Sequence, residues 1–326
     1  MFIGFLRGYC MFISYNLEDF GQELKKLRKS LGFSQIDVQE KVGVNVDTIR
    51  KVESGRVIPR YDTLELLSVA YKEDLLELLK NCRPNKFLME FYDDLDYIIT
   101  CYDKASTANL KTKLLQNFSA NLNLSIVNPL ELQQFIIFAD CVDAYYADIY
   151  SPNITAKQAL VNALQLTIHN YNIKKFKRYK YSYIEFRILI LISLFIANEL
   201  NFAFSNEILY YILEKISDRA YITKYLDFLI INLRFNIAYN YHMLDNHAKV
   251  IEVADTGIAY CIEKRTNHAL FSLYYRKAIA QYKLGDSQYI ESMKTAFYLI
   301  KAVKIPKLLE QYQKITLEKY GISIEL

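Results

Sequence analysis

Apolar residues recur at helical spacing along most of the chain, and short runs of Gly, Asn, Asp and Ser separate the segments that carry them. In the first eighty positions this pattern predicts five short helices, over about 18–31, 35–42, 46–54, 63–71 and 75–79. Ser34 precedes the second of them with Asp37 three positions later, as in a capping box, and Asn45 precedes the third. Three glycines stand where helices should end: Gly32, Gly43 and Gly55.

The same spacing continues to the end of the chain in longer amphipathic segments. They predict helices over about 85–102, 108–122, 130–150, 155–169, 181–201, 206–216, 222–244, 248–264, 268–284, 287–303 and 306–320. Turn-like sequences recur at Leu200, Leu244 and Leu284, at intervals of 44 and 40 residues, which favours stacked helical hairpins. The pattern resembles tetratricopeptide repeats, with Ala278 where one helix must approach its neighbour closely.

Composition supports an all-α protein, because 9 Gly and 5 Pro among 326 residues are too few for the many turns of a sheet protein. We therefore predict an N-terminal five-helix, lambda-repressor-like helix-turn-helix domain over residues 16–80. A TPR-like right-handed helical-repeat domain should follow over residues 85–326, and it should carry sensing and dimerisation.

The cysteines and histidines give no sign of a metal site or cofactor. The five cysteines form no CxxC pair, and the four histidines show no HExxH spacing, so we expect reduced thiols in a cytoplasmic protein, with no metal and no cofactor.

No apolar run approaches the roughly 20 residues that a membrane span requires, so no membrane partner is expected. Motifs for catalysis, such as a Gly-rich phosphate loop or a GxSxG elbow, are missing from the sequence, and we predict that the protein is not an enzyme.

Charge is concentrated near the predicted helix-turn-helix. The whole chain carries a formal charge of +4, and residues 21–60 alone hold nine basic and five acidic side chains. A local excess of this kind favours contact with nucleic acid. The alternative is an ordinary small helical bundle whose charged face is simply solvated.

The stretch SQIDVQEKVGVNVDTIRKVESGRVIP resembles the DNA-binding domain shared by phage repressors and xenobiotic-response-element (XRE) regulators. In that family the helix after the turn lies in the major groove. The resemblance implies base contacts from Val46, Asp47 and Lys51. It also implies phosphate contacts from Gln35, Asn45, Ser54 and Arg56. Thr48 and Arg50, on the same helix, complete the candidate DNA-binding set. Arg28 and Glu53 match a charged pair that ties the first helix to the third in the family.

The side-chain chemistry of the three candidate base readers is consistent with this role. Lys51 can donate to guanine O6 and N7, Asp47 can accept from cytosine N4, and Val46 can touch a thymine methyl group. Because many relatives carry Ser, Arg or Gln at the positions of Val46 and Asp47, the sequence does not specify the operator.

In the predicted repeats, Asn232, Asn236 and Asn240 recur every four residues and should form one stripe on a helix. A side-chain amide both donates and accepts, so such a stripe could pair with the backbone of an extended peptide. Tyr275 and Arg276 on the next hairpin could add an aromatic contact and a cation for a peptide carboxylate. The alternative for the asparagines is exposure or packing against neighbouring repeats, and for the tyrosine it is a place in the core.

The order of the segments ITAKQAL, YIEFRILILI, LRFNIAYNY, DTGIAYCIEK and LYYRKAIAQYKLGD, behind the N-terminal module, resembles the peptide-pheromone regulators of Gram-positive bacteria, the RRNPP superfamily with its PlcR and Rgg branches. The resemblance implies a quorum-sensing transcriptional regulator. A homodimer would bind double-stranded operator DNA, and a short signalling peptide would bind the concave face of the repeats and contact Asn236. Unlike relatives with Asn in the helix over 181–201, this chain has Ile190 and Leu191 there.

Two other functions are compatible with the same domains. The repeats could hold a protein partner, such as an antirepressor or a scaffold, and a flat exposed patch rather than a groove would favour that function. A catalytic repeat domain with an appended DNA anchor would require a closed pocket with clustered carboxylates or histidines, and the sequence shows no such cluster.

Overall fold

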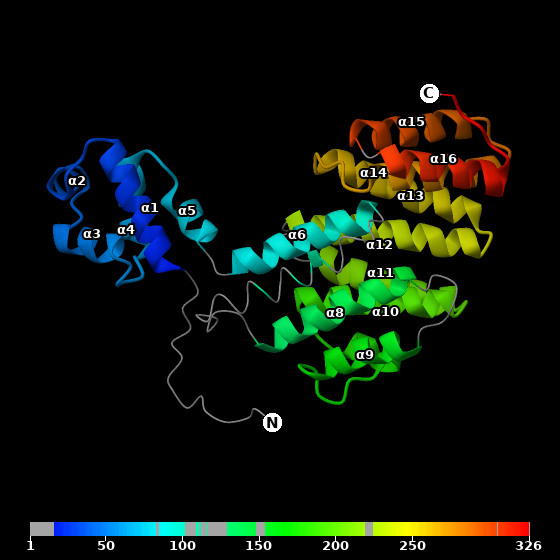
Figure 1. Cartoon of the computed structure of the whole chain (residues 1–326), viewed down its shortest axis with the longest axis horizontal. Coiled ribbons are helices and arrows are strands. Elements are labelled where there is room, and N and C mark those ends of the chain that lie inside the picture. The colour runs from blue at the N-terminus through cyan, green and yellow to red at the C-terminus, as the bar shows by residue number, and fades with distance from the viewer. Residues whose placement is uncertain are drawn as a thin grey trace. The chain divides into compact units, whose positions relative to one another are not determined.

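The computed structural model describes residues 16–82, 85–101, 109–110, 112, 116, 129–147, 154–218, 224–304 and 306–325 (Figure 1). The chain divides into two compact units, the first formed by residues 1–92 and 116–128 and the second by 93–115 and 129–326. The division falls within helix α6 (Asn85–Cys101) rather than at the predicted boundary between 80 and 85. Most of the helix predicted over 108–122 lies outside the described residues.

The first unit contains the five predicted helices. They are α1 (Leu17–Ser30), α2 (Gln35–Val42), α3 (Val46–Glu53), α4 (Tyr61–Tyr71) and α5 (Leu75–Asn81). Ser34 and Asp37 form the predicted capping box, and the Asn45 side chain accepts from Asp47 N at the start of α3. Gly43 ends α2 in the left-handed conformation at φ 72°. Local sequence signals therefore determine both ends of the turn between α2 and α3.

The core of this unit depends on one close approach that the hydrophobic pattern did not predict. Gly21 lies in the middle of α1, and a Cβ built there would lie 2.5 Å from the Glu53 carbonyl oxygen. No side chain fits in that space, so the glycine lets α1 pack directly against the end of α3. Around this contact the core contains Phe20, Leu24, Ile49 and Val52, each almost fully buried.

The second unit is a stack of helices in which each α helix from α8 onward packs against the next one in the chain. The helices are α8 (Pro129–Ala147), α9 (Ile154–Gln165), α10 (Tyr183–Asn198), α11 (Phe202–Ser217), α12 (Lys224–Met243), α13 (His247–Glu263), α14 (Leu270–Lys283), α15 (Tyr289–Ala302) and α16 (Pro306–Tyr320). The described residues contain no strand, which confirms the all-α class.

Most turns and close contacts in this stack lie where the sequence predicted them. The predicted turns contain residues in the left-handed conformation, namely Leu200 at φ 63°, Asp245 at φ 55° and Gly285 at φ 74°. Ala278 is fully buried between α14 and its neighbours, as predicted. A short 3-10 helix, η1 (Ile173–Arg178), was not predicted and lies in the connection between α9 and α10.

Candidate DNA-binding surface and ligand groove

The candidate base-reading side chains lie on the outer face of α3. Asp47, Arg50 and Lys51 are exposed, whereas Ile49 and Val52 on the opposite face are buried in the core of the first unit. Val46 and Thr48 are half-buried at the start of the helix. The face that the helix-turn-helix resemblance assigns to DNA is therefore accessible in the described part of the chain.

Two of these side chains, Asp47 and Lys51, are paired with each other. Lys51 Nζ lies 2.7 Å from Asp47 Oδ2, one helical turn away, and Arg50 Nη1 lies 3.6 Å from Asp47 Oδ1. The hydrogen bond from Lys51 lowers the pKa of the Asp47 carboxyl, and the positive charges of Lys51 and Arg50 act in the same direction. Asp47 therefore stays ionised and holds both cations on the outer face of the helix.

The predicted pair of Arg28 and Glu53 is a buried junction between α1 and α3. Arg28 donates from Nε to Glu53 Oε1 at 2.5 Å and from Nη2 to Oε2 at 2.9 Å, and its Nη1 donates to the Phe33 carbonyl. Gln35 Nε2 also donates to Glu53 Oε2, at 2.9 Å. The side-chain nitrogen of Gln35 is thus engaged within the protein, and only its amide oxygen has no partner among the described residues.

The other candidate phosphate contacts lie at the two ends of α3. Asn45 uses its side-chain oxygen to cap the helix, which leaves its amide nitrogen for a phosphate. Ser54 Oγ donates to the Lys51 carbonyl, and Arg56 is exposed beyond the helix end. Sequence reasoning missed Gln39, whose side-chain oxygen accepts from Val46 N at 2.9 Å and so joins α2 to the start of α3.

In the second unit, three of the five candidate peptide-binding residues line one cavity of about 190 Å³. Asn232 and Asn236 reach it from α12, and Arg276 reaches it from α14. Aromatic rings form much of the remaining wall: Tyr145, Phe228, Phe235 and Tyr239. The cavity combines amides and a guanidinium with flat apolar surfaces.

Asn232 and Asn236 are hydrogen-bonded to each other, and this arrangement leaves one amide nitrogen and one amide oxygen without a protein partner in the described part of the chain. Asn236 Nδ2 donates to the Asn232 carbonyl oxygen at 2.8 Å and to Asn232 Oδ1 at 2.6 Å. Among the described residues, Asn232 Nδ2 and Asn236 Oδ1 have no protein partner. Because Asn236 is only 9% exposed, its side chain is held by the surrounding helices.

The guanidinium of Arg276 lies against two aromatic rings. Its Cζ lies 5.0 Å from the centre of the Phe235 ring and 4.7 Å from that of Tyr239. No carboxylate of the described residues forms an ion pair with Arg276, and its buried Nε has no hydrogen-bond partner there. A cation stacked in this way is available to an anionic group in the cavity.

Asn240 and Tyr275 do not share this cavity. Asn240 is fully buried, and its Nδ2 donates to Ser205 Oγ and Asn206 Oδ1 on α11, each at 2.9 Å. Tyr275 is 7% exposed, and its hydroxyl lies 3.0 Å from Thr316 Oγ1 on α16. The prediction that both residues bind the peptide was therefore wrong. Both pack against neighbouring helices instead, which was the alternative considered for them.

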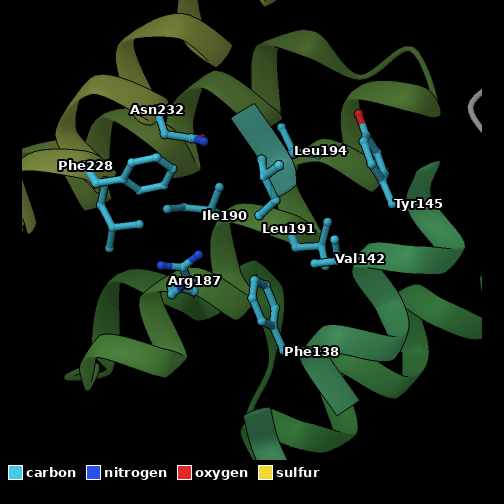
Figure 2. Close-up of a pocket in the computed structure, with 11 residues that line it drawn as sticks. Phe138, Val142, Tyr145, Arg187, Ile190, Leu191, Leu194, Phe228 and Asn232 are labelled. Carbon is cyan, nitrogen blue, oxygen red and sulfur yellow. The ribbon is translucent and has the colours of Figure 1, made fainter. Parts of the chain in front are cut away.

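A smaller cavity of about 50 Å³ adjoins the first and shares several of its lining residues (Figure 2). Ile190 and Leu191 of α10 line it together with Phe138, Val142 and Leu194. These aliphatic and aromatic side chains make the cavity predominantly apolar. Arg187 at its edge is ion-paired with the buried Asp96.

A third cavity, of about 540 Å³, adjoins the first at Thr100, Phe228 and Ala269. Its wall carries Asp93 and Asp227 together with Lys264 and His268. Asp227 Oδ1 accepts a hydrogen bond of 2.5 Å from the Tyr260 hydroxyl. The three adjoining cavities form the groove, with a guanidinium in one part and carboxylates in another.

Neither a metal centre nor a membrane span is found in the described residues. No group of three or more His, Cys, Asp or Glu side chains there is placed so that it could hold a metal ion. No described helix has both the length and the apolar character needed to cross a membrane.

Comparison with known proteins distinguishes the helix-turn-helix from the rest of the chain. Residues 24–78 match the Helix-turn-helix family, which covers α2 and α3 and most of the first unit's core. Comparison with curated proteins gave no significant match over the chain. The protein therefore has a helix-turn-helix domain followed by a stack of helices.

Solved structures extend the likeness to nearly the whole chain. Bacillus thuringiensis PlcR in complex with the peptide PapR7 and DNA superposes with a TM-score of 0.69 at 16% identity, covering 90% of this chain and 99% of PlcR. ComR from S. thermophilus with DNA and its signalling peptide ComS gives a TM-score of 0.60 at 14% identity, covering 93% and 100%. The Streptococcus dysgalactiae SHP pheromone receptor Rgg2 gives 0.55 at 11% identity, covering 93% and 99%. The fold is that of PlcR, ComR and Rgg2, which confirms the fold that the sequence resemblance implied.

Proposed function

We propose that this protein is a cytoplasmic transcriptional regulator that binds operator DNA through α3 and is switched by a short peptide in the groove of the second unit. The observation that carries the proposal is the pairing of a helix-turn-helix domain with a groove containing Asn232, Asn236 and Arg276. The solved complexes of PlcR and ComR, each with a peptide and DNA, support it. This function requires no catalysis.

The asparagine pair suits the main chain of an extended peptide. Asn232 Nδ2 can donate to a peptide carbonyl while Asn236 Oδ1 accepts from a peptide N–H, because their mutual hydrogen bonds hold the other ends of both amides. Recognition of the main chain is independent of side chains. It therefore contributes to affinity, while specificity must come from elsewhere in the groove.

The rest of the groove then selects the ligand by charge and polarity. Arg276 suits a carboxylate, either the peptide C-terminus or an acidic side chain. The apolar cavity beside Ile190 and Leu191 suits an aliphatic or aromatic side chain. The part of the groove that carries Asp93 and Asp227 suits an ammonium group. A short peptide with an apolar side chain, a free C-terminus and a free amino group meets these requirements.

On DNA, we propose that a homodimer presents two copies of α3 to a two-fold operator, as helix-turn-helix dimers do. Lys51 and Asp47 would contact base edges, while Asn45, Ser54 and Arg56 would contact phosphates. The peptide can shift the protein between DNA-binding states only if it binds one of them more tightly than the other. Ligand and DNA affinities should then be coupled, each altering the other by the same factor.

Fluorescence anisotropy of the full-length protein on its own upstream DNA tests both parts of the proposal. Titrations are made with and without synthetic peptides from neighbouring small reading frames, at several salt concentrations. We expect salt-dependent DNA binding that one peptide alters at low concentration. DNA binding that no peptide alters would favour a protein partner for the repeats, and failure to bind any duplex from a random pool would refute the DNA-binding role.

A further inference from the structure

The connection between α9 and α10 carries a dense cluster of positive charge that the proposed function does not use. Within seven positions, in and directly after η1, the chain has five basic side chains, all of them exposed: Lys174, Lys175, Lys177, Arg178 and Lys180. We call residues 173–180 the basic loop. It belongs to the second unit and lies outside the helix-turn-helix.

Most of this charge is not neutralised by the protein. Lys177 forms an ion pair with Glu207, with an Nζ–Oε1 distance of 2.6 Å. The other four cations have no ion pair with any carboxylate of the described residues. Like charges this close repel each other, since the separations along seven residues are comparable to the screening length of about 8 Å at physiological salt. A bound anion would relieve this repulsion.

The backbone of the basic loop is nevertheless held tightly by tyrosine hydroxyls. Tyr181 Oη donates to the Phe176 carbonyl at 2.8 Å, and Tyr211 Oη donates to the Tyr179 carbonyl at 3.2 Å. The Phe176 ring is buried and packs edge-on against Tyr211, with ring centres 5.2 Å apart. The cations thus project from a fixed support, and little backbone ordering is needed when they bind a partner.

The burial of the apolar residues in the basic loop indicates which class of anionic partner the loop can bind. Surfaces that bind membranes combine basic residues with exposed apolar ones, and the centre of a protein interface is usually apolar or aromatic. In the basic loop, Phe176 faces the core, and no large hydrophobic residue is among the exposed ones. The exposed side chains of the loop are all cationic, while Ile173 and Tyr179 are half-buried. Such a surface suits contacts to a phosphate backbone, which require no apolar burial.

We propose that the basic loop is a second DNA-contacting surface, which binds phosphates of duplex DNA. This inference rests on the proposed DNA-binding function. It adds a contact from the second unit that is independent of base sequence. The loop would increase affinity for any duplex of sufficient length and would steepen the salt dependence of binding without changing which bases are preferred.

The test is the slope of log affinity against log salt concentration, measured by anisotropy with full-length protein. The duplex is one that the wild-type protein selects from a random pool, extended by a helical turn on each side. The test variant combines Lys174→Gln, Lys175→Gln, Arg178→Gln and Lys180→Gln. The control variant combines Lys294→Gln, Lys301→Gln, Lys307→Gln and Lys319→Gln, exposed positions on α15 and α16, and has the same net charge.

We expect the slope of the test variant to be shallower by about 0.9 for each phosphate that the four cations neutralise in the wild type. Affinity for selected and unrelated duplexes should fall together, while the control keeps the wild-type slope. Equal slopes in wild type and both variants would overturn the inference but leave the proposed function intact. Equal reductions in test and control variants would also overturn it, because they would reflect total charge. If the wild type binds no duplex, the proposed function itself fails.

Discussion

The guanidinium of Arg28 on α1 and the carboxylate of Glu53 at the end of α3 form a buried two-point ion pair, with nitrogen–oxygen distances of 2.5 and 2.9 Å. Both residues are less than a tenth exposed. Gln35 on α2 donates to the same carboxylate, so three helices meet at Glu53. The pair therefore fixes the orientation of α3 relative to the rest of the first unit.

Removing the charge of Glu53 should destabilise the first unit. In Glu53→Gln the Arg28 cation stays buried without its counter-charge, and breaking a buried pair in this way costs about 3 to 5 kcal/mol. Denaturant unfolding followed by circular dichroism measures the change. Glu40→Gln, at an exposed position of α2, is the matched control and should leave the unfolding midpoint in place. A wild-type midpoint for Glu53→Gln would show that the pair does not stabilise the unit.

The first unit was predictable from the sequence because its borders are set by local signals. The capping box of Ser34 and Asp37 and the left-handed turn at Gly43 depend on residues within one or two helical turns. Contacts between helices were less accessible to prediction. The hydrogen bond from Val46 N to Gln39, and the packing of Gly21 against the Glu53 backbone, become visible only when two helices are placed together.

Loss of the Lys51 side chain should reduce operator discrimination more than general DNA affinity. A bidentate base contact is worth about 1 to 3 kcal/mol of discrimination, whereas phosphate contacts supply the sequence-independent part of binding. Asp47 would also lose the cation 2.7 Å away that it now holds. The measurement compares affinities of Lys51→Ala for selected and unrelated duplexes. Lys26→Ala, an exposed site on α1, is the control, and unchanged selectivity in Lys51→Ala would exclude Lys51 from base reading.

Asn236 and Asn240 should respond differently to the same substitution, although both lie on α12. Asn236→Ala should weaken or abolish the peptide response while the second unit stays folded, because Asn236 lines the groove. Asn240→Ala should instead lower stability by about 1 to 3 kcal/mol, since its hydrogen bonds to Ser205 and Asn206 are buried. Peptide titration and denaturant unfolding of both variants separate the two effects. Loss of stability with intact peptide affinity in Asn236→Ala would assign it a structural role.

The asparagine stripe shows where a sequence argument fails for geometric reasons. A step of four residues overshoots one helical turn by about 40°, so Asn240 lies about 80° around the helix from Asn232. The first two asparagines therefore face the groove, and the third faces α11. Tyr275 and Arg276 are neighbours in sequence, about 100° apart on α14, and only Arg276 faces the groove.

His242 should make the second unit less stable in mild acid. Burial lowers the pKa of His242 to about 4, assisted by the positive charge of Arg276, from an ordinary value of 6.5. Between these two values the unfolded chain binds a proton that the folded protein does not, so stability falls as the pH decreases from 6.5 towards 4. At neutral pH the imidazole is uncharged in both states, and this contribution to the pH dependence vanishes.

The effect of His242 is isolated by comparing pH profiles, since carboxylates titrate in the same range. Unfolding midpoints are measured from pH 7 to pH 4 for wild type, His242→Gln and His169→Gln, the last at an exposed position. We expect the profile of His242→Gln to be flatter than that of wild type, because glutamine takes up no proton when the chain unfolds. His169→Gln should follow the wild-type curve, and parallel curves for all three proteins would show that His242 keeps its ordinary pKa in the folded state. Tyr320 Oη lies 3.2 Å from His242 Nε2, so an imidazolium formed in the folded protein can only donate to this hydroxyl, which must then act as the acceptor.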